Sequence, residues 1–247
     1  MTGAAPGHVE GMTTTAATGT KPSVLVFDVN ETLSDLSALG ARFVEVGASA
    51  STAPLWFAAT LRDGFALTAA GQNPPFAEVA QAQLASLLSE SLLNRSVDEA
   101  VRLIMDGFRS LELHPDVASG VRQLQEAGFR LVTLSNGATS VAERLLEGGT
   151  GDCFERLLSV EDAGAWKPSP RAYAHALSVC EVAADEAMLV SVHPWDIDGA
   201  RRAGLQAAWV NRTGAPWPGI FEEPTHTVAS IEELPELWRA EGGAPSV

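Results

Sequence analysis

A short apolar run that ends at an aspartate constrains the fold more than any other feature of the chain. The residues from Val24 to Phe27 are β-branched, aliphatic or aromatic, which is typical of a buried parallel strand. Asp28 follows directly, and Thr32 lies four residues further on. A carboxylate in this place lies at the carboxyl edge of the sheet, where open α/β sheets bind their ligands. Asp28 is therefore a candidate nucleophile, metal ligand or turn cap.

From about residue 113 the chain alternates between helical and strand patterns, which predicts a doubly wound parallel sheet of the α/β class. Gly128 and Gly204 mark the ends of two helices, and Pro170 marks the start of another. Helices are predicted over 117–127, 139–146, 170–179, 196–203 and 231–238, and further strands over 129–134, 154–160, 188–192 and 206–210.

Residues 37–112 interrupt this alternation with helical patterns over 38–46, 55–70, 76–93 and 97–108, separated by Gly, Pro, Asn and Ser. We expect an α/β core domain of residues 22–36 and 113–240, with an inserted α-helical cap domain of residues 37–112 over the end of the first strand. The Gly-, Ala-, Thr- and Pro-rich residues 1–21 predict a disordered leader, and residues 241–247 a flexible tail.

Composition limits the partners of the chain. Its 247 residues carry a formal net charge of −15, which argues against nucleic acid or an anionic membrane surface as a partner. A small anionic substrate stays compatible with this charge, because local cations and helix N-termini can bind it. No apolar run approaches the roughly 20 residues of a membrane helix. Cys153 and Cys180 form no CxxC pattern, so we expect reduced thiols and a cytoplasmic location.

Polar residues follow four of the predicted strands and so meet at one edge of the sheet. Taken singly each has an ordinary structural explanation: a turn cap, a helix cap or a solvated surface charge. The set consists of Asp28 with Thr32, Ser135 with Asn136, Lys167 before the helix that starts at Pro170, and the segment from Ser191 to Asp198.

These segments resemble the four motifs of the haloacid dehalogenase (HAD) superfamily, and within it most closely the L-2-haloacid dehalogenases of type II. The resemblance extends from about residue 22 to about residue 240 and implies a Rossmann-like core with a helical cap. The matching segments are Phe27-Asp28-Val-Asn-Glu-Thr32, Leu134-Ser135-Asn136-Gly137, Lys167-Pro-Ser-Pro-Arg-Ala-Tyr173 and Val190-Ser191-Val-His-Pro-Trp-Asp196.

The resemblance implies hydrolysis of a 2-haloalkanoic acid to the 2-hydroxy acid through an ester on Asp28. A carboxylate nucleophile divides a difficult displacement into two easier steps. Lys167, Thr32 and Ser135 are the groups that can keep such a carboxylate ionised. Asp196, with Lys167 nearby, is expected to position or activate the water that hydrolyses the ester. No cofactor is implied, and a homodimer stays open because enzymes of this type are often dimers.

The remaining motif residues are expected to bind substrate. Ser135 and the backbone amides of Val29 and Asn30 would hold the substrate carboxylate, and Asn136 would lie against the departing halide. Other expected members of the site are Tyr173, Ser191, His193, Trp195 and Phe57. Taken alone, Tyr173 would more often be a core aromatic, and His193 a turn residue before Pro194.

Two positions depart from the type II pattern. Phe57 stands where those enzymes carry a halide-binding arginine, and Arg62 lies five residues on, about 500° around a helix. His193 replaces an asparagine and introduces a group that titrates near neutral pH.

Two other functions stay open. HAD phosphatases carry a general acid at the position of Asn30, and a metal carboxylate at the position of Val192, so a Mg²⁺-dependent phosphatase is a weaker alternative. A HAD-fold protein that binds a metabolite without dehalogenase activity is the other alternative, which Phe57 keeps open.

Overall fold

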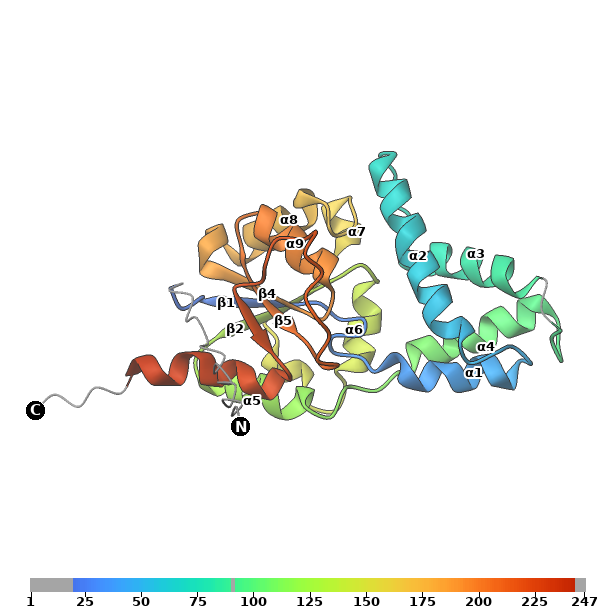
Figure 1. The fold of residues 1–247 in the computed structure, drawn as a ribbon, viewed down its shortest axis with the longest axis horizontal. Helices are drawn as coiled ribbons and strands as arrows, with labels where there is room; N and C mark the ends of the chain where they lie inside the picture. The colour runs from blue at the N-terminus through green and yellow to red at the C-terminus, as the bar shows by residue number, and fades with distance from the viewer. Residues whose placement is uncertain (1–19, 90–91, 243–247) are drawn as a thin grey trace, which may run out of the picture.

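The computed structural model describes residues 20–89 and 92–242, and at its centre is a parallel sheet of six strands (Figure 1). The expected disordered leader and flexible tail fall largely outside these residues. The strands lie in the order β3-β2-β1-β4-β5-β6. The order reverses between β1 and β4, which is where such sheets open a ligand crevice. The strands are β1 (Val24–Phe27), β2 (Arg130–Ser135), β3 (Arg156–Ser159), β4 (Ala187–Ser191), β5 (Gln206–Val210) and β6 (His226–Val228).

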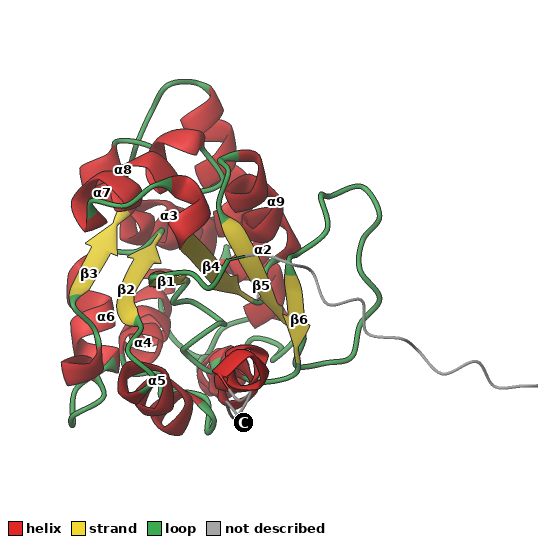
Figure 2. Cartoon of the chain, turned by 90° about the vertical axis from the view of Figure 1, so that its left-hand side faces the viewer, coloured by secondary structure: helices red, strands yellow, loops and turns green. Residues whose placement is uncertain are grey.

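Helices cover both faces of the sheet, as Figure 2 shows. α5 (Val117–Glu126), α6 (Thr139–Leu145) and a C-terminal 3-10 helix (Ile231–Gly242) lie on one face, and α8 (Pro170–Cys180) and α9 (Pro194–Arg202) on the other. Alternate residues of β1 therefore point into different cores. Leu25 packs with the residues of α5, whereas Val26 packs with those of α8 and α9. The doubly wound α/β fold predicted from the alternating pattern is confirmed.

Four helices between β1 and α5 form a separate bundle beside the carboxyl end of the sheet (Figure 1). They are α1 (Leu39–Glu45), α2 (Thr52–Ala69), α3 (Phe76–Leu88) and α4 (Val97–Arg109). Aromatic rings fill the interior of the bundle: Phe108 lies edge-on to Trp56 at 5.6 Å and stacks on Phe76 at 5.4 Å. No helix in the described residues is long and apolar enough to cross a bilayer.

Trp166 fixes the bundle to the sheet. Its indole N–H donates to the Pro74 carbonyl oxygen at 2.9 Å, and its ring stacks on Phe76 at 5.6 Å. Gly64 of α2 lies directly against the indole, where a Cβ atom would overlap the ring. Because Trp166 immediately precedes Lys167, the contact places the bundle relative to the sheet edge.

The predicted elements differ from the observed ones in a few places. The helix expected over 76–93 ends at Leu88, where Ser89 Oγ donates back to the Ser86 carbonyl oxygen. The strand expected over 154–160 is β3 alone, because Val160 begins a short helix, α7 (Val160–Ala163). β6 was not predicted, since three residues are too few to display a strand pattern. The final helix is of the 3-10 type and contains Pro235, which has no N–H to donate.

Candidate active site

Asp28 lies at the point where the strand order reverses. Its backbone N–H still donates to the Val190 carbonyl oxygen of β4 at 3.0 Å, which holds it at the carboxyl end of β1. The side chain is buried, with 5% of its surface exposed. The sheet topology therefore places a carboxylate in the crevice where α/β folds bind ligands.

Lys167 joins Asp28 to the second acidic motif residue. Its Nζ lies 2.9 Å from Asp28 Oδ1 and 2.7 Å from Asp196 Oδ2, and its side chain is fully buried. The side chain of Asn136 holds the Lys167 backbone, because Asn136 Oδ1 accepts from the Lys167 N–H at 2.9 Å. Asp28, Lys167 and Asp196 thus form a buried charge triad, assembled from residues 139 and 29 positions apart.

The triad keeps Asp28 ionised. Burial alone would raise the pKa of this carboxyl, but the charges of Lys167 and His193 and the hydrogen bond from Thr32 bring it below its usual value. Thr32 Oγ1 donates to Asp28 Oδ2 at 2.6 Å. Thr32 Oγ1 in turn accepts from the Val192 N–H at 3.1 Å, which fixes the hydroxyl. A buried, ionised carboxylate is suited to nucleophilic attack.

Asp196 has a different environment from Asp28. Burial raises the pKa of the Asp196 carboxyl, and the negative charge of Asp28 adds to this, although Lys167 acts in the opposite direction. Its Oδ1 accepts from the Tyr173 hydroxyl at 2.6 Å. Gly199 leaves room for that hydroxyl, since a Cβ atom there would lie 2.5 Å from it. The two carboxyls of the triad therefore have pKa values shifted in opposite directions, a pattern typical of a nucleophile paired with a base.

Ser135 and Asn136 lie at the end of β2, on one side of Asp28. Ser135 Oγ accepts from the Gly137 N–H at 2.9 Å, and within residues 20–89 and 92–242 its own hydroxyl hydrogen has no acceptor. Asn136 is buried and bonded to both backbone groups of Lys167. Ser191, at the end of β4, is also buried and accepts from the His193 N–H at 3.1 Å. Val29 and Asn30 follow Asp28 and are likewise buried.

A stack of three rings closes the other side of Asp28. The His193 ring lies between Phe57 of α2, at 6.3 Å, and Trp195, at 5.0 Å. His193 Nε2 is 3.6 Å from Asp28 Oδ2 and 3.1 Å from the Asn30 carbonyl oxygen. Arg62 lies on the exposed surface of α2, paired with Asp63, and does not reach this stack. Of the expected site residues, Thr32, Lys167 and His193 contact Asp28 directly, whereas Tyr173 reaches it only through Asp196 and Lys167. Ser135 makes no hydrogen bond or ion pair with Asp28 within the described residues and lies at the end of the neighbouring strand β2.

Sequence reasoning missed Glu31. Its Oε2 lies 3.7 Å from His193 Nε2, and burial raises the pKa of its carboxyl. Its φ of 65° is unusual for a residue other than glycine and turns the chain just after Asp28. A position three residues after the expected nucleophile was the only available signal. Asp198, by contrast, pairs with Arg202 on α9 and plays no part in the triad.

The donor set around Asp28 does not suit Mg²⁺. This cation requires several oxygen ligands in octahedral geometry, and Lys167 Nζ already lies between the two carboxylates. Val192 and His193 supply no further carboxylate. Within the described parts of the chain, no group of three or more His, Cys, Asp or Glu side chains is arranged to hold a metal ion.

The chain is similar to known proteins over most of its length. A family profile described as haloacid dehalogenase-like hydrolase matches residues 22–204. Haloacetate dehalogenase H-2 of Moraxella sp. (strain B) is 29% identical over 88% of this chain and 98% of its own length. (S)-2-haloacid dehalogenase 4A of Burkholderia cepacia is 32% identical over 85% of this chain and 91% of its own length.

Among solved structures, one described as a dehalogenase with an intermediate complex superposes with a TM-score of 0.82 at 29% identity. It covers 88% of this chain, which in turn covers 97% of that protein. The superposition therefore extends over most of both chains. By fold and by sequence, the chain belongs to the haloacid dehalogenase-like hydrolases and is related within them to the 2-haloacid dehalogenases.

Proposed function

We propose that the protein hydrolyses the carbon–halogen bond of a short 2-haloalkanoic acid through an ester on Asp28. The observation that carries the proposal is the buried triad, in which Lys167 Nζ lies within 2.9 Å of both Asp28 and Asp196. The triad supplies an ionised nucleophile, a fixed cation and a second carboxyl with a raised pKa. The relatives named above, which are dehalogenases of haloacetate and 2-haloacids, support the substrate class.

In the first step a carboxylate oxygen of Asp28 attacks C2 of the substrate from the side opposite the halogen. The new C–O bond forms as the C–halogen bond breaks, the halide leaves with the electron pair, and C2 is inverted. The Ser135 hydroxyl and the amides of Val29 and Asn30 bind the substrate carboxylate, and Asn136 lies against the halide. Since halide needs no proton to depart, Asn30 in place of a general acid suits this reaction.

In the second step water attacks the ester carbonyl carbon of Asp28. Asp196 accepts a proton from that water, and its raised pKa favours this role. Lys167 stabilises the charge that develops on the ester oxygen, and Tyr173 keeps Asp196 in place through its 2.6 Å hydrogen bond. The ester C–O bond then breaks, and the departing alkoxide takes the proton held by Asp196 and leaves as the 2-hydroxy acid. The new Asp28 carboxyl gives its proton to solvent, which restores the carboxylate.

Halide release from chloroacetate and 2-chloropropionate by the purified protein tests the proposal. We expect Asp28→Asn to lose at least about 1,000-fold in rate, because the nucleophile is removed. Its melting temperature should stay within a few degrees of wild type. Asp106→Asn, at a carboxylate with 75% of its side chain exposed, is the matched control and should retain full activity.

Three further measurements separate the alternatives. Mass spectrometry after rapid quenching should find the 1-carboxyalkyl group of the substrate attached as an ester to Asp28. EDTA should leave halide release unchanged, whereas a large loss would favour a metal-dependent reaction. Phosphate release that requires Mg²⁺ would support a phosphatase instead, and absence of both activities would indicate a protein that only binds its ligand.

A further inference from the structure

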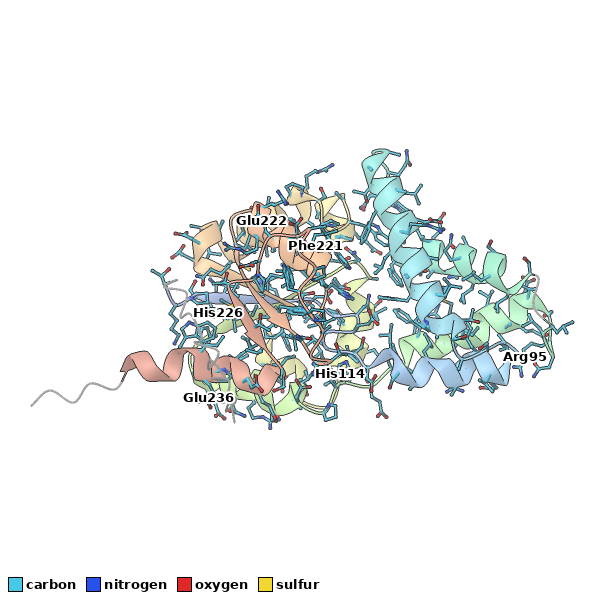
Figure 3. All side chains as sticks on the ribbon, viewed as in Figure 1. Arg95, His114, Phe221, Glu222, His226 and Glu236 are labelled. Carbon is cyan, nitrogen blue, oxygen red and sulfur yellow. The ribbon has the colours of Figure 1, made fainter. Side chains whose placement is uncertain are left out.

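A cleft of about 570 Å³ lies between the bundle and the carboxyl ends of β4 and β5. One wall comes from the segment after β1 and from α1 and α2, and the other from the residues that follow β4 and β5. Its lining is mainly apolar, and includes Leu36, Leu39, Ala53, Phe57, Val192 and Trp209. His114, labelled in Figure 3 on the segment between α4 and α5, lies at its border.

The cleft is separated from Asp28 by a single ring. His193 and Phe57 both line it, and His193 Nε2 is only 3.6 Å from Asp28 Oδ2. The cleft lies on the β4 and β5 side of Asp28, whereas Ser135 and Asn136 lie on the β2 side. A molecule reacting at Asp28 can therefore extend in two directions, one polar and one apolar.

The charges of the cleft favour an uncharged occupant. Asp35 is ionised, since hydrogen bonds from Ser37 lower the pKa of its carboxyl. Arg212 is already neutralised by Asp116 at 2.7 Å. Burial and the charge of Arg212 lower the pKa of His114, which is therefore neutral near pH 7. A carboxylate gains little here, but burying each methylene of an apolar chain is favourable by about 0.8 kcal/mol, or about fourfold in affinity.

We propose that this cleft binds the carbon chain of a 2-haloacid longer than three carbons, with the His193 ring turning aside where the chain passes. The proposal rests on the proposed function and extends its substrate class from short 2-haloacids to longer ones. Pockets of about 300–1,000 Å³ bind molecules much larger than chloroacetate. The carboxylate remains at Ser135 and the chain lies across the end of β4 toward Trp209.

Binding of acids that carry no halogen tests the cleft independently of catalysis. Calorimetric titration with propionate, hexanoate and octanoate should show an affinity that rises about threefold to fourfold per methylene. Ala50→Phe and Thr213→Phe place a ring in the cleft from opposite walls, at exposed positions. Each should weaken octanoate binding about tenfold and propionate binding less than twofold. Ala58→Phe, at an exposed position of α2 outside the cleft, is the matched control.

Affinity that is the same for all chain lengths, or no binding of any of the acids, would overturn the proposal. So would a chain-length effect that survives both filling variants, because the chain would then lie elsewhere, for example along Trp195. The two proposals fail separately. If chloroacetate releases halide but affinity does not depend on chain length, the cleft proposal is wrong and the proposed reaction stands. If the filling variants abolish a chain-length effect but no 2-haloacid releases halide, the cleft stands as a binding site and the proposed reaction is wrong.

Discussion

At the scale of single residues, the candidate site depends on which charges are buried together. The chain has only two lysines, and one of them, Lys167, is fully buried between two carboxylates. The charges of Asp196 and Asp28 raise the pKa of its ammonium group, although burial acts against them. A buried cation with two anionic partners is costly to remove, because the partners then remain without compensation.

We expect Lys167→Met to destabilise the protein by about 3–5 kcal/mol near pH 8 and to abolish activity. Without the cation, burial and mutual repulsion raise the pKa of both carboxyls above their unfolded values. The folded variant then binds protons more tightly than the unfolded chain. Its loss of unfolding free energy relative to wild type should therefore shrink as the pH falls toward about 5. Urea unfolding at both pH values measures this, with Lys21→Met as the control at the exposed lysine. An equal loss of unfolding free energy at both pH values would contradict the proposed coupling of Lys167 to the two carboxyls.

Tyr173 offers a direct reading of the site, since it is the only tyrosine in the chain. Burial, and then the negative charge of Asp196, raise the pKa of its hydroxyl well above 10.0. In an ultraviolet titration, the folded protein should therefore show no tyrosinate at a pH where the urea-unfolded chain is already half ionised. A raised pKa stabilises the fold below pH 10 and ceases to do so above it, so stability should fall on the alkaline side. Ionisation of the native protein near pH 10 would show that Tyr173 does not contact Asp196.

At the scale of secondary-structure elements, the position of the bundle depends on the contact of α2 with Trp166. Phe65 of α2 also lies edge-on to Trp195 at 4.9 Å, so α2 contacts the loops on both sides of Asp28. The backbone N–H of Trp166 donates to Thr68 Oγ1 at 3.3 Å, which adds a polar contact at the same junction. A change in how α2 packs should therefore reach Lys167, the next residue along the chain.

Gly64→Ala tests this coupling, because the added methyl overlaps the Trp166 ring. We expect a loss of about 1–3 kcal/mol in stability and a lower kcat/KM, as Trp166 shifts and Lys167 with it. Gly219→Ala, where a Cβ meets nothing within 4 Å, is the control. In a double-mutant cycle, Trp166→Phe should reduce the stability cost of Gly64→Ala, since the smaller ring leaves space for the methyl. Additive costs would show that the two residues do not interact.

At the scale of the whole molecule, the sequence was sufficient to predict the α/β class and most strands, but not how the helical bundle packs on them. The run before Asp28 and the alternating pattern after residue 113 carry their periodicity locally, so both were predictable. The triad was predictable only as a set of residues at one edge. The ring stack of Phe57, His193 and Trp195 was not predictable, because it depends on how α2 meets the end of β4. The 570 Å³ cleft is likewise a property of that junction and has no sequence pattern of its own.

The net charge of −15 has a consequence for catalysis that concerns the whole molecule. An anionic haloacid approaches a protein of the same sign, so long-range repulsion slows the encounter. Salt screens this repulsion beyond a Debye length of about 10 Å at 0.1 M, whereas the buried triad is screened much less. We therefore expect kcat/KM for 2-chloropropionate to rise, on the order of twofold, between low and moderate ionic strength, with kcat nearly unchanged.

Sodium sulfate is the suitable salt for this measurement, because chloride is a product of the reaction. The uncharged amide of the same haloacid, if it is turned over, provides the control, since its encounter rate should not depend on ionic strength. A fall in kcat/KM with added salt would mean that a local cluster of positive charge steers the substrate. The basic groups nearest the cleft would then be the residues to replace, beginning with Arg212. That outcome would also mean that Asp116, 2.7 Å from Arg212, does not fully neutralise its charge.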